Sequence, residues 1–157
     1  MVQEHEKIVV VGIDGTAESL GALRWALNEA VTLEADVEVV HCYLPQTLTD
    51  FAFGKPRELH TASVIMVENE VKTALGDMPQ PPEVRRCSVT GDPAKVLRER
   101  AATASLLVLG AHSQTALRDL VLGRIAQSCI RRAPCPIVVV DRDQNIVRRK
   151  TPAAQRH

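Results

Sequence analysis

Two glycines and the polar segment between them are the residues of this chain with the clearest chemical potential. Gly110 ends an apolar run, SLLVLG, and Gly123 stands just before a helical pattern. A strand that ends at a glycine and leads through a loop to a helix start is typical of phosphate-binding α/β proteins. The glycine permits close backbone approach, and the first helical N–H groups face the anion. We therefore interpret the Gly110–Gly123 segment as a candidate anion-binding loop.

A second candidate group is the carboxylate of Asp14, which follows the first apolar run, IVVVGID. If the strands Ile8–Ile13 and Leu106–Leu109 are neighbours in one sheet, Asp14 and Gly110 face each other across a crevice. Open α/β sheets bind their ligands in such a crevice, beyond the carboxyl ends of the strands. An aspartate here is also suited to a simpler role, capping the loop before the first helix. Both interpretations stay open at the level of the sequence.

The elements that must position these residues alternate along the chain. Apolar runs predict strands at residues 8–14, 37–44, 84–89, 105–110 and 137–140, and helical stripes predict helices at about 16–34, 64–75, 93–101 and 122–129. Five strands alternating with four helices predict an α/β fold, an open five-stranded parallel sheet with helices on both faces. The polar run 84–89 is expected at an edge of this sheet.

The C-terminal part of the chain loses its periodicity after Val140. We expect one domain over residues 1–141 and a basic, disordered tail over residues 142–157. The strand Ile137–Val140 would then end the sheet as an exposed apolar edge, which is a template for pairing with another chain. The economical solution is a two-fold homodimer through this strand.

Composition excludes several classes of protein. Among 157 residues, 19 Lys and Arg balance 19 Asp and Glu, so no overall field favours nucleic acid or a membrane surface. No apolar run approaches the roughly 18 residues of a membrane span, and the acidic start MVQEHEKIVV does not resemble a signal peptide, so we expect a cytoplasmic protein. The four cysteines lack zinc-site spacing, and we expect them to be core residues and no metal to be bound.

Familiar nucleotide and phosphate motifs are also absent from the sequence. It contains no G-x-x-x-x-G-K-[ST], and no G-x-G-x-x-G follows the first strand. A receiver domain would need an aspartate after the third strand and a lysine after the fifth, where Thr90 and Asp141 stand instead. No strong general base accompanies the Gly110–Gly123 loop. We therefore expect no catalytic residues, and at most slow hydrolysis of a bound phosphate compound.

From about residue 7 to residue 140, the sequence resembles the universal stress protein family. The segment VVGIDGTAESLGALRWALNEA is similar to the family's opening strand and helix, with Asp14 at the adenine-recognition position, and APCPIVVV resembles its closing strand. The fourth-strand region resembles the family's nucleotide signature, G-x2-G-x9-G-[ST]. The fixed positions of that signature are occupied here by Gly110, Ser113, Gly123 and Arg124.

This resemblance implies a Rossmann-like fold of the adenine nucleotide alpha hydrolase type and a site for ATP, with AMP or ADP as alternatives. Asp14 would accept a hydrogen bond from the adenine amino group, backbone near Ile13 and Cys42 would flank the base, and the start of the last helix would meet the phosphates. The implied site residues are Gly12, Ile13, Asp14, Cys42, Leu109, Gly110, His112, Ser113, Gly123, Arg124, Ile125 and Ala126.

Two positions depart from the signature, and their effect decides whether nucleotide binding is expected or lost. Ser113 replaces a glycine and narrows the loop, or donates its hydroxyl to a phosphate. Arg124 replaces a small hydroxyl residue, and it would either clamp the phosphates or fill their pocket. The main expectation is a non-enzymatic, nucleotide-binding stress-response dimer, and the alternative is an interaction protein of the same fold that has lost nucleotide binding. A nucleotide-hydrolysing or adenylating enzyme is a third hypothesis, although no second substrate domain is visible.

Overall fold

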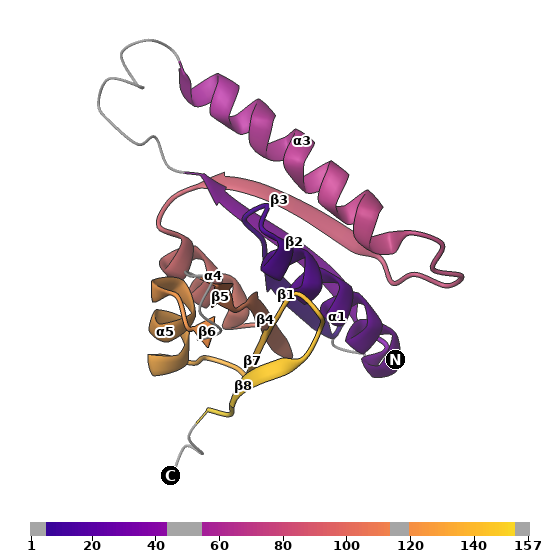
Figure 1. The fold of residues 1–157 in the computed structure, drawn as a ribbon, viewed down its shortest axis with the longest axis vertical. Helices are drawn as coiled ribbons and strands as arrows, with labels where there is room; N and C mark the ends of the chain where they lie inside the picture. The colour runs from indigo at the N-terminus through magenta and orange to yellow at the C-terminus, as the bar shows by residue number, and fades with distance from the viewer. Residues whose placement is uncertain (1–5, 44–54, 114–119, 153–157) are drawn as a thin grey trace, which may run out of the picture.

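The computed structural model describes residues 6–43, 55–113 and 120–152, which form a twisted sheet flanked by helices (Figure 1). The helices are α1 (Ala17–Leu33), α3 (Lys55–Leu75), α4 (Pro93–Ala101) and α5 (Arg124–Arg131). The strands are β1 (Ile8–Gly12), β2 (Asp36–Tyr43), β3 (Val84–Thr90), β4 (Leu106–Gly110), β5 (His112–Ser113), β6 (Leu120–Val121), β7 (Ile137–Val140) and β8 (Ile146–Lys150).

The main sheet has the strand order β3-β2-β1-β4-β7-β8, and all neighbours are parallel except β7 and β8. The predicted α/β class is therefore confirmed, with one more strand than expected. β1 and β4 lie side by side at the centre, with Val9 opposite Leu106 and Val11 opposite Val108. The polar strand β3 lies at an edge, as its sequence predicted.

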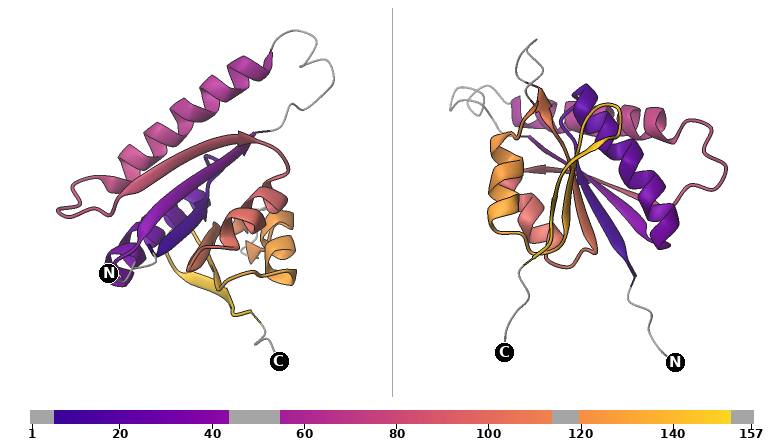
Figure 2. Two further views of the ribbon diagram at one scale, coloured as in Figure 1. Left: turned by 180° about the vertical axis from the view of Figure 1, so that it is seen from behind. Right: turned by 60° about the horizontal axis from the view of Figure 1, so that its bottom comes forward.

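Helices cover both faces of this sheet, as Figure 2 shows with the sheet seen nearly edge-on. Because side chains alternate along a strand, Val9 and Val11 face the layer formed by α1 and α3, whereas Val10 faces the layer formed by α4 and α5. Both layers are built from aliphatic side chains. This explains why near-continuous Val and Leu runs occur in β1, β4 and β7, which are buried on two faces.

The direction of winding reverses between β1 and β4. From β1 the chain proceeds outward through β2 to β3, and it then returns through α4 to place β4 on the other side of β1. The connections at the carboxyl ends of β1 and β4 therefore diverge, which leaves a crevice at that point of the sheet. Many of the residues predicted to bind a ligand lie at the carboxyl ends of these two strands or directly after them.

The C-terminal region differs from the expectation, because residues 146–150 form β8, antiparallel to β7. A turn closes this hairpin: Asp141 Oδ1 accepts hydrogen bonds from the backbone N–H groups of Asp143 (2.9 Å) and Asn145 (2.8 Å), and Gln144 takes a left-handed φ of 67°. The prediction of a disordered tail is wrong for β8, while residues 153–157 lie outside the described chain.

The hairpin also changes the expected dimer contact. The apolar strand Ile137–Val140 is not an open edge, because β8 pairs with it along its outer side. A second copy could pair with β7 only after displacing β8. The premise of the dimer prediction, an exposed edge at Ile137–Val140, is therefore wrong, whereas the homodimer itself stays a prediction.

Smaller differences concern helix starts and the loop after β4. Helix α3 begins at Lys55, so Pro56 lies in a first helical turn rather than in a loop, where its missing N–H is tolerated. The segment after Gly110 contains β5, which pairs antiparallel with β6. Ile125 lies in α5 within the predicted helix, and its side chain is 37 % exposed.

None of the helices within the described ranges has the length and apolar character needed to cross a bilayer.

Candidate functional site

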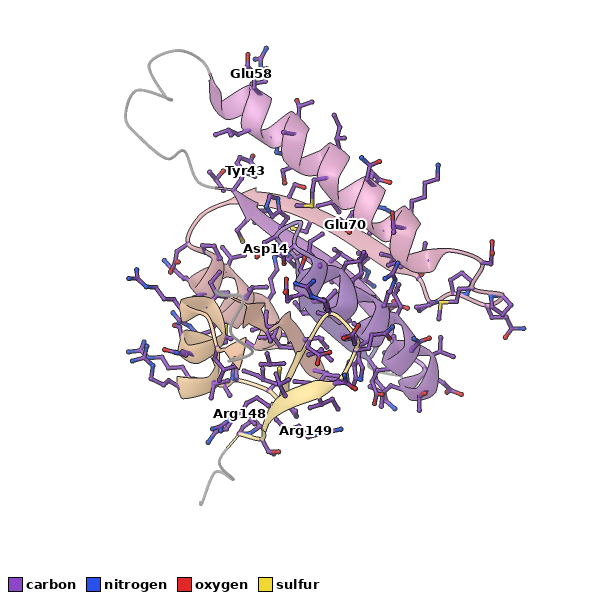
Figure 3. The ribbon with its side chains drawn as sticks, in the orientation of Figure 1. Asp14, Tyr43, Glu58, Glu70, Arg148 and Arg149 are labelled. Carbon is purple, nitrogen blue, oxygen red and sulfur yellow. The ribbon has the colours of Figure 1, made fainter. Side chains whose placement is uncertain are left out.

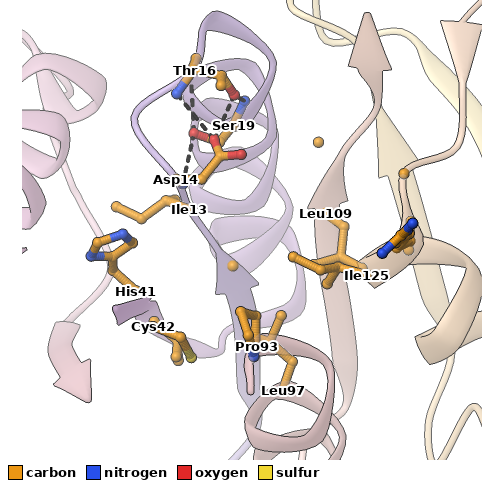
Figure 4. A pocket seen from close by; sticks show the side chains of 16 residues that line it. Ile13, Asp14, Thr16, Ser19, His41, Cys42, Pro93, Leu97, Leu109 and Ile125 are labelled. Carbon is orange, nitrogen blue, oxygen red and sulfur yellow. Dashed lines mark hydrogen bonds between the residues drawn. The ribbon is translucent and has the colours of Figure 1, made fainter. Parts of the chain in front are cut away.

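A cavity of about 390 Å³ opens at the carboxyl ends of β1 and β4, where the winding reverses (Figure 4). This volume lies within the ordinary range for small-molecule sites, which runs from roughly 300 to 1,000 Å³. The lining residues come from β1, β2, β4, α4 and the starts of α1 and α5. They are Gly12, Ile13, Asp14, Thr16, Ser19, Val40, His41, Cys42, Pro93, Leu97, Leu109, Gly110, Gly123, Arg124, Ile125 and Ala126.

Most of the predicted site residues lie around this one cavity. Asp14 and the Gly123–Ala126 segment, which are far apart in the sequence, both line it. The structure describes only the backbone of His112 and Ser113, which form β5, so the roles expected of their side chains stay predictions. The other ten predicted residues are lining residues: Gly12, Ile13, Asp14, Cys42, Leu109, Gly110, Gly123, Arg124, Ile125 and Ala126.

Asp14 is held by the start of α1. Its Oδ1 accepts hydrogen bonds from Thr16 N (3.0 Å) and Thr16 Oγ1 (2.6 Å), and Thr16 Oγ1 in turn accepts from Ser19 N as the helix N-cap (Figure 4). Ser19 Oγ also accepts a hydrogen bond from Asp14 N at 3.2 Å. Asp14 therefore does cap this loop. Its Oδ2 accepts no hydrogen bond from the described residues, so one carboxylate oxygen is left at the cavity.

The start of α5 forms another wall of the cavity. Gly123 is the N-cap, with extended backbone (φ −64°, ψ 168°) and no side chain to satisfy the first helical N–H groups. These N–H groups and the helix dipole favour an anion. Arg124 is exposed, and its guanidinium forms no ion pair with any described residue. This wall therefore offers both backbone donors and an exposed positive charge.

The two glycines of β1 and β4 that line the cavity serve different contacts. A Cβ on Gly110 would lie 2.8 Å from the backbone carbon and 2.9 Å from the backbone oxygen of Glu18, in the first turn of α1. Gly110 thus permits close packing of β4 on α1, in addition to any approach of a ligand. A Cβ on Gly12 would instead meet the side-chain ends of Leu97 and Leu109 at 3.0 to 3.2 Å.

His41 lines the cavity from the end of β2. Its Nδ1 lies 2.6 Å from Ser63 Oγ of α3, a hydroxyl that is almost completely buried. Burial lowers the pKa of His41 below its ordinary value, and the negative charge of Asp14 partly opposes this shift. The imidazole is therefore neutral at pH 7 and hydrogen-bonded. His41 is therefore a hydrogen-bonded residue of the cavity wall.

Cys42 supplies part of the apolar wall. Burial is the largest cause that raises the pKa of its thiol to about 11, and the neighbouring Cys87 acts in the same direction. The thiol is protonated at neutral pH and is a poor nucleophile. All four cysteines are free, and burial also raises the pKa values of Cys129 and Cys135 to about 11. Within the described part of the chain, no cluster of His, Cys, Asp or Glu is suited to hold a metal ion.

Several lining residues were not predicted. Thr16 and Ser19 could have been expected, because a T-x-x-S pattern directly after β1 marks a helix start at the same end of the sheet. Pro93 and Leu97 belong to α4, and only the spatial path of the crossover from β3 to β4 brings them to the cavity. Their sequence carries no signal for this role.

Together, these features define a doubly wound α/β domain with a ligand-sized cavity at its switch point. The model of the universal stress protein family matches residues 6–141, and the chain belongs to this family. The described fold and the family model thus agree with the resemblance that the sequence motifs indicated.

Individual relatives are more distant. Universal stress protein Rv2005c of Mycobacterium tuberculosis is 27 % identical to this chain over 150 residues. The match covers 88 % of this chain and 49 % of the relative, so the chain spans about half the length of that relative. Among solved structures, a universal stress protein in complex with cAMP has a TM-score of 0.58 and 24 % identity, covering 88 % of this chain and 99 % of the other. An Arabidopsis thaliana family member, At3g01520 with AMP bound, has a TM-score of 0.59 and 17 % identity, covering 86 % and 91 %.

Proposed function

We propose that this universal stress protein binds an adenine nucleotide in the cavity between β1 and β4 and acts by binding rather than by turnover. The single observation that carries the proposal is the convergence of Asp14 and the α5 start on one cavity. Structural neighbours that hold cAMP and AMP support the ligand class. The resemblance of the loop to the family's nucleotide signature supports it independently.

The adenine base is assigned to the side of the cavity formed by Ile13, Asp14 and Cys42. An adenine amino group is a hydrogen-bond donor, and Asp14 Oδ2 is an acceptor to which no described residue donates a hydrogen bond. The apolar surfaces of Ile13 and Cys42 are suited to the faces of a flat ring. Because Thr16 fixes the other carboxylate oxygen, Asp14 is oriented before a ligand arrives.

The phosphate is assigned to the α5 start. Arg124, Ile125 and Ala126 form the first turn of α5 and line the cavity. The N–H groups of a first helical turn have no partner within the helix and favour an anion. The exposed Arg124 side chain can add a charge-assisted contact to a phosphate oxygen. Ser113 replaces a glycine of the signature, and the proposal does not fix how many phosphates of the nucleotide bind here. ATP, ADP and AMP are all candidate ligands.

The side chains able to transfer a proton, Asp14 and His41, lie at the end of the cavity opposite the start of α5, where the phosphate is proposed to bind. Figure 4 shows Asp14 and His41 on one side and Ile125 on the other. The carboxylate is engaged by Thr16, and His41 is hydrogen-bonded to Ser63. No lining side chain described here is therefore placed as a general base beside the proposed phosphate position. This arrangement supports a binding protein, with slow hydrolysis at most.

Calorimetric titration with AMP, ADP and ATP tests the proposal. We expect the parent protein to bind at least one of them, and Arg124→Ser to bind it with altered affinity. Arg131→Ser, at the far end of the same helix, is the matched control and should bind like the parent.

Two results would change the conclusion. If Arg124→Ser binds and the parent does not, Arg124 closes the pocket and the chain is an interaction protein of this fold. If neither binds any of the three nucleotides, the proposal is wrong.

A further inference from the structure

The outer edge of β8 is a surface that the nucleotide proposal does not use. β8 is the last strand of the sheet, and none of the strands in the described ranges pairs with its outer side. An edge strand presents backbone N–H and C=O groups to its surroundings, and an extended peptide can join it by forming those hydrogen bonds. At roughly 3.4 Å per residue, β8 offers an edge of about 17 Å.

The side chains of this edge are strongly basic. Arg148, Arg149 and Lys150 are consecutive and exposed, and they project from the end of the sheet as Figure 3 shows for the two arginines. None of the three forms an ion pair with a described residue. Their charges are therefore available to a partner. Such clustering stands out because the whole chain carries equal numbers of acidic and basic residues.

The basic side chains are distributed over both faces of the sheet. Arg148 lies opposite Val139, and Val139 faces the α4 and α5 layer. Arg149 lies opposite Val138, which faces the α1 and α3 layer. A strand paired with β8 would thus meet a cation on each face. Acidic side chains at successive positions of that strand could each find an opposite charge, and such cross-strand pairs are favourable.

A second copy of this chain fits the same edge poorly. In a two-fold antiparallel pairing over all five residues of β8, Arg148 would lie opposite its own copy and Val147 opposite Arg149. Like charges directly opposite each other destabilise a strand pair. Lysine and arginine on an edge strand are a known protection against self-association. The charge pattern therefore favours a different, acidic partner.

We propose that β8 is a docking edge for an extended acidic segment of another protein, which would join the sheet beside β8 as an additional strand. This proposal is independent of nucleotide binding. Two features support it together: an edge that pairs with no strand of the described ranges, and three cations along it that pair with none of the described acidic residues. Charge alone would suit nucleic acid equally well, whereas a free strand edge suits a peptide backbone.

The test uses a fluorescent peptide of consecutive glutamates with a threonine at each end, and a second peptide of the same sequence with every backbone amide methylated. Both carry the same charge, but the methylated peptide cannot form a continuous ladder. We expect the first peptide to bind the full chain, with amide NMR shifts concentrated in residues 146–150. The methylated peptide should bind at least about tenfold more weakly, because several net-favourable backbone hydrogen bonds are lost.

Charge variants complete the test. The double variant R148E/R149E should lose binding of the first peptide, and R131E/R132E, with the same charge change at the end of α5, should bind like the parent. Equal binding of both peptides would overturn the proposal, because charge rather than strand addition would then explain it. Tighter binding of an oligothymidylate of equal charge, self-association through residues 146–150, or no binding of the first peptide would overturn it as well.

Discussion

Arg142, in the turn between β7 and β8, forms a 2.7 Å ion pair with Glu18, in the first turn of α1. The Glu18 side chain is 9 % exposed and that of Arg142 is 57 % exposed, so a surface arginine covers an almost buried carboxylate. Next to this pair, a Cβ on Gly21 would lie 2.5 Å from the backbone oxygen of Asp141. The hairpin that covers β7 is therefore packed against the helix whose start helps to form the cavity.

Loss of this ion pair should loosen the hairpin. In Arg142→Met, we expect the backbone amides of β8 to exchange with solvent at least about threefold faster, because one of the contacts that hold the hairpin on α1 is gone. Hydrogen exchange followed by mass spectrometry or NMR measures this change. Arg149→Met, whose guanidinium has no described ionic partner, is the control. Equal exchange in both variants would show that the pair does not anchor β8.

Gly110 should tolerate no side chain. We expect Gly110→Ala to lower the free energy of unfolding by about 1 to 3 kcal/mol, because the new methyl group would press on the backbone of Glu18 rather than on a side chain that can move. Chemical denaturation measures the difference. Gly12→Ala is the matched comparison and should cost less, since its neighbours are the flexible ends of Leu97 and Leu109. The reverse order would contradict the described packing of β4 on α1.

The central fold could be predicted from the sequence because its strands are buried on two faces. Continuous Val and Leu runs in β1, β4 and β7 have no other good explanation in a chain of this length. β8 could not be recognised from hydrophobicity, because only Ile146 and Val147 precede three cations. The residues Asp-Arg-Asp-Gln-Asn that precede β8 are typical of a turn and are a sequence signal for this hairpin.

The site was predictable to the extent that strand ends could be identified. Asp14 and Gly110 follow neighbouring central strands, so their proximity follows from the parallel order of β1 and β4. The contribution of α4 through Leu97 depends on where a crossover helix lies in space, which no local pattern specifies. The need for a glycine at position 110 could likewise be recognised only from the structure, because it arises from the short distance to the backbone of Glu18.

The neutral state of His41 predicts a pH dependence of stability. Burial lowers the pKa of His41 in the folded protein below its ordinary value of 6.5. Below pH 6.5, His41 binds a proton in the unfolded chain, whereas in the folded chain it stays neutral until the pH reaches its lower pKa. The stability contribution of His41 is therefore complete above pH 6.5 and is lost as the pH falls toward the folded pKa.

We expect this loss to begin below about pH 6.5 in denaturation experiments made between about pH 7.5 and about pH 5.5. His41→Asn keeps a polar group near the position of Nδ1 and can still bond to Ser63, but it does not titrate. The parent should lose more stability than this variant as the pH falls. Parallel curves for the two proteins would show that His41 titrates normally in the folded state.

The most direct test of the account is the affinity of the parent and of Asp14→Asn for AMP and for IMP. Adenine presents an amino donor where hypoxanthine presents a carbonyl acceptor, and asparagine can keep the bond to Thr16 with its oxygen while turning a donor toward the cavity. We expect the parent to prefer AMP. The variant should lose about 10- to 100-fold in AMP affinity, from one hydrogen bond to a charged group, and should shift its preference toward IMP. Equal AMP affinity in the two proteins would contradict the assignment of the base to Asp14.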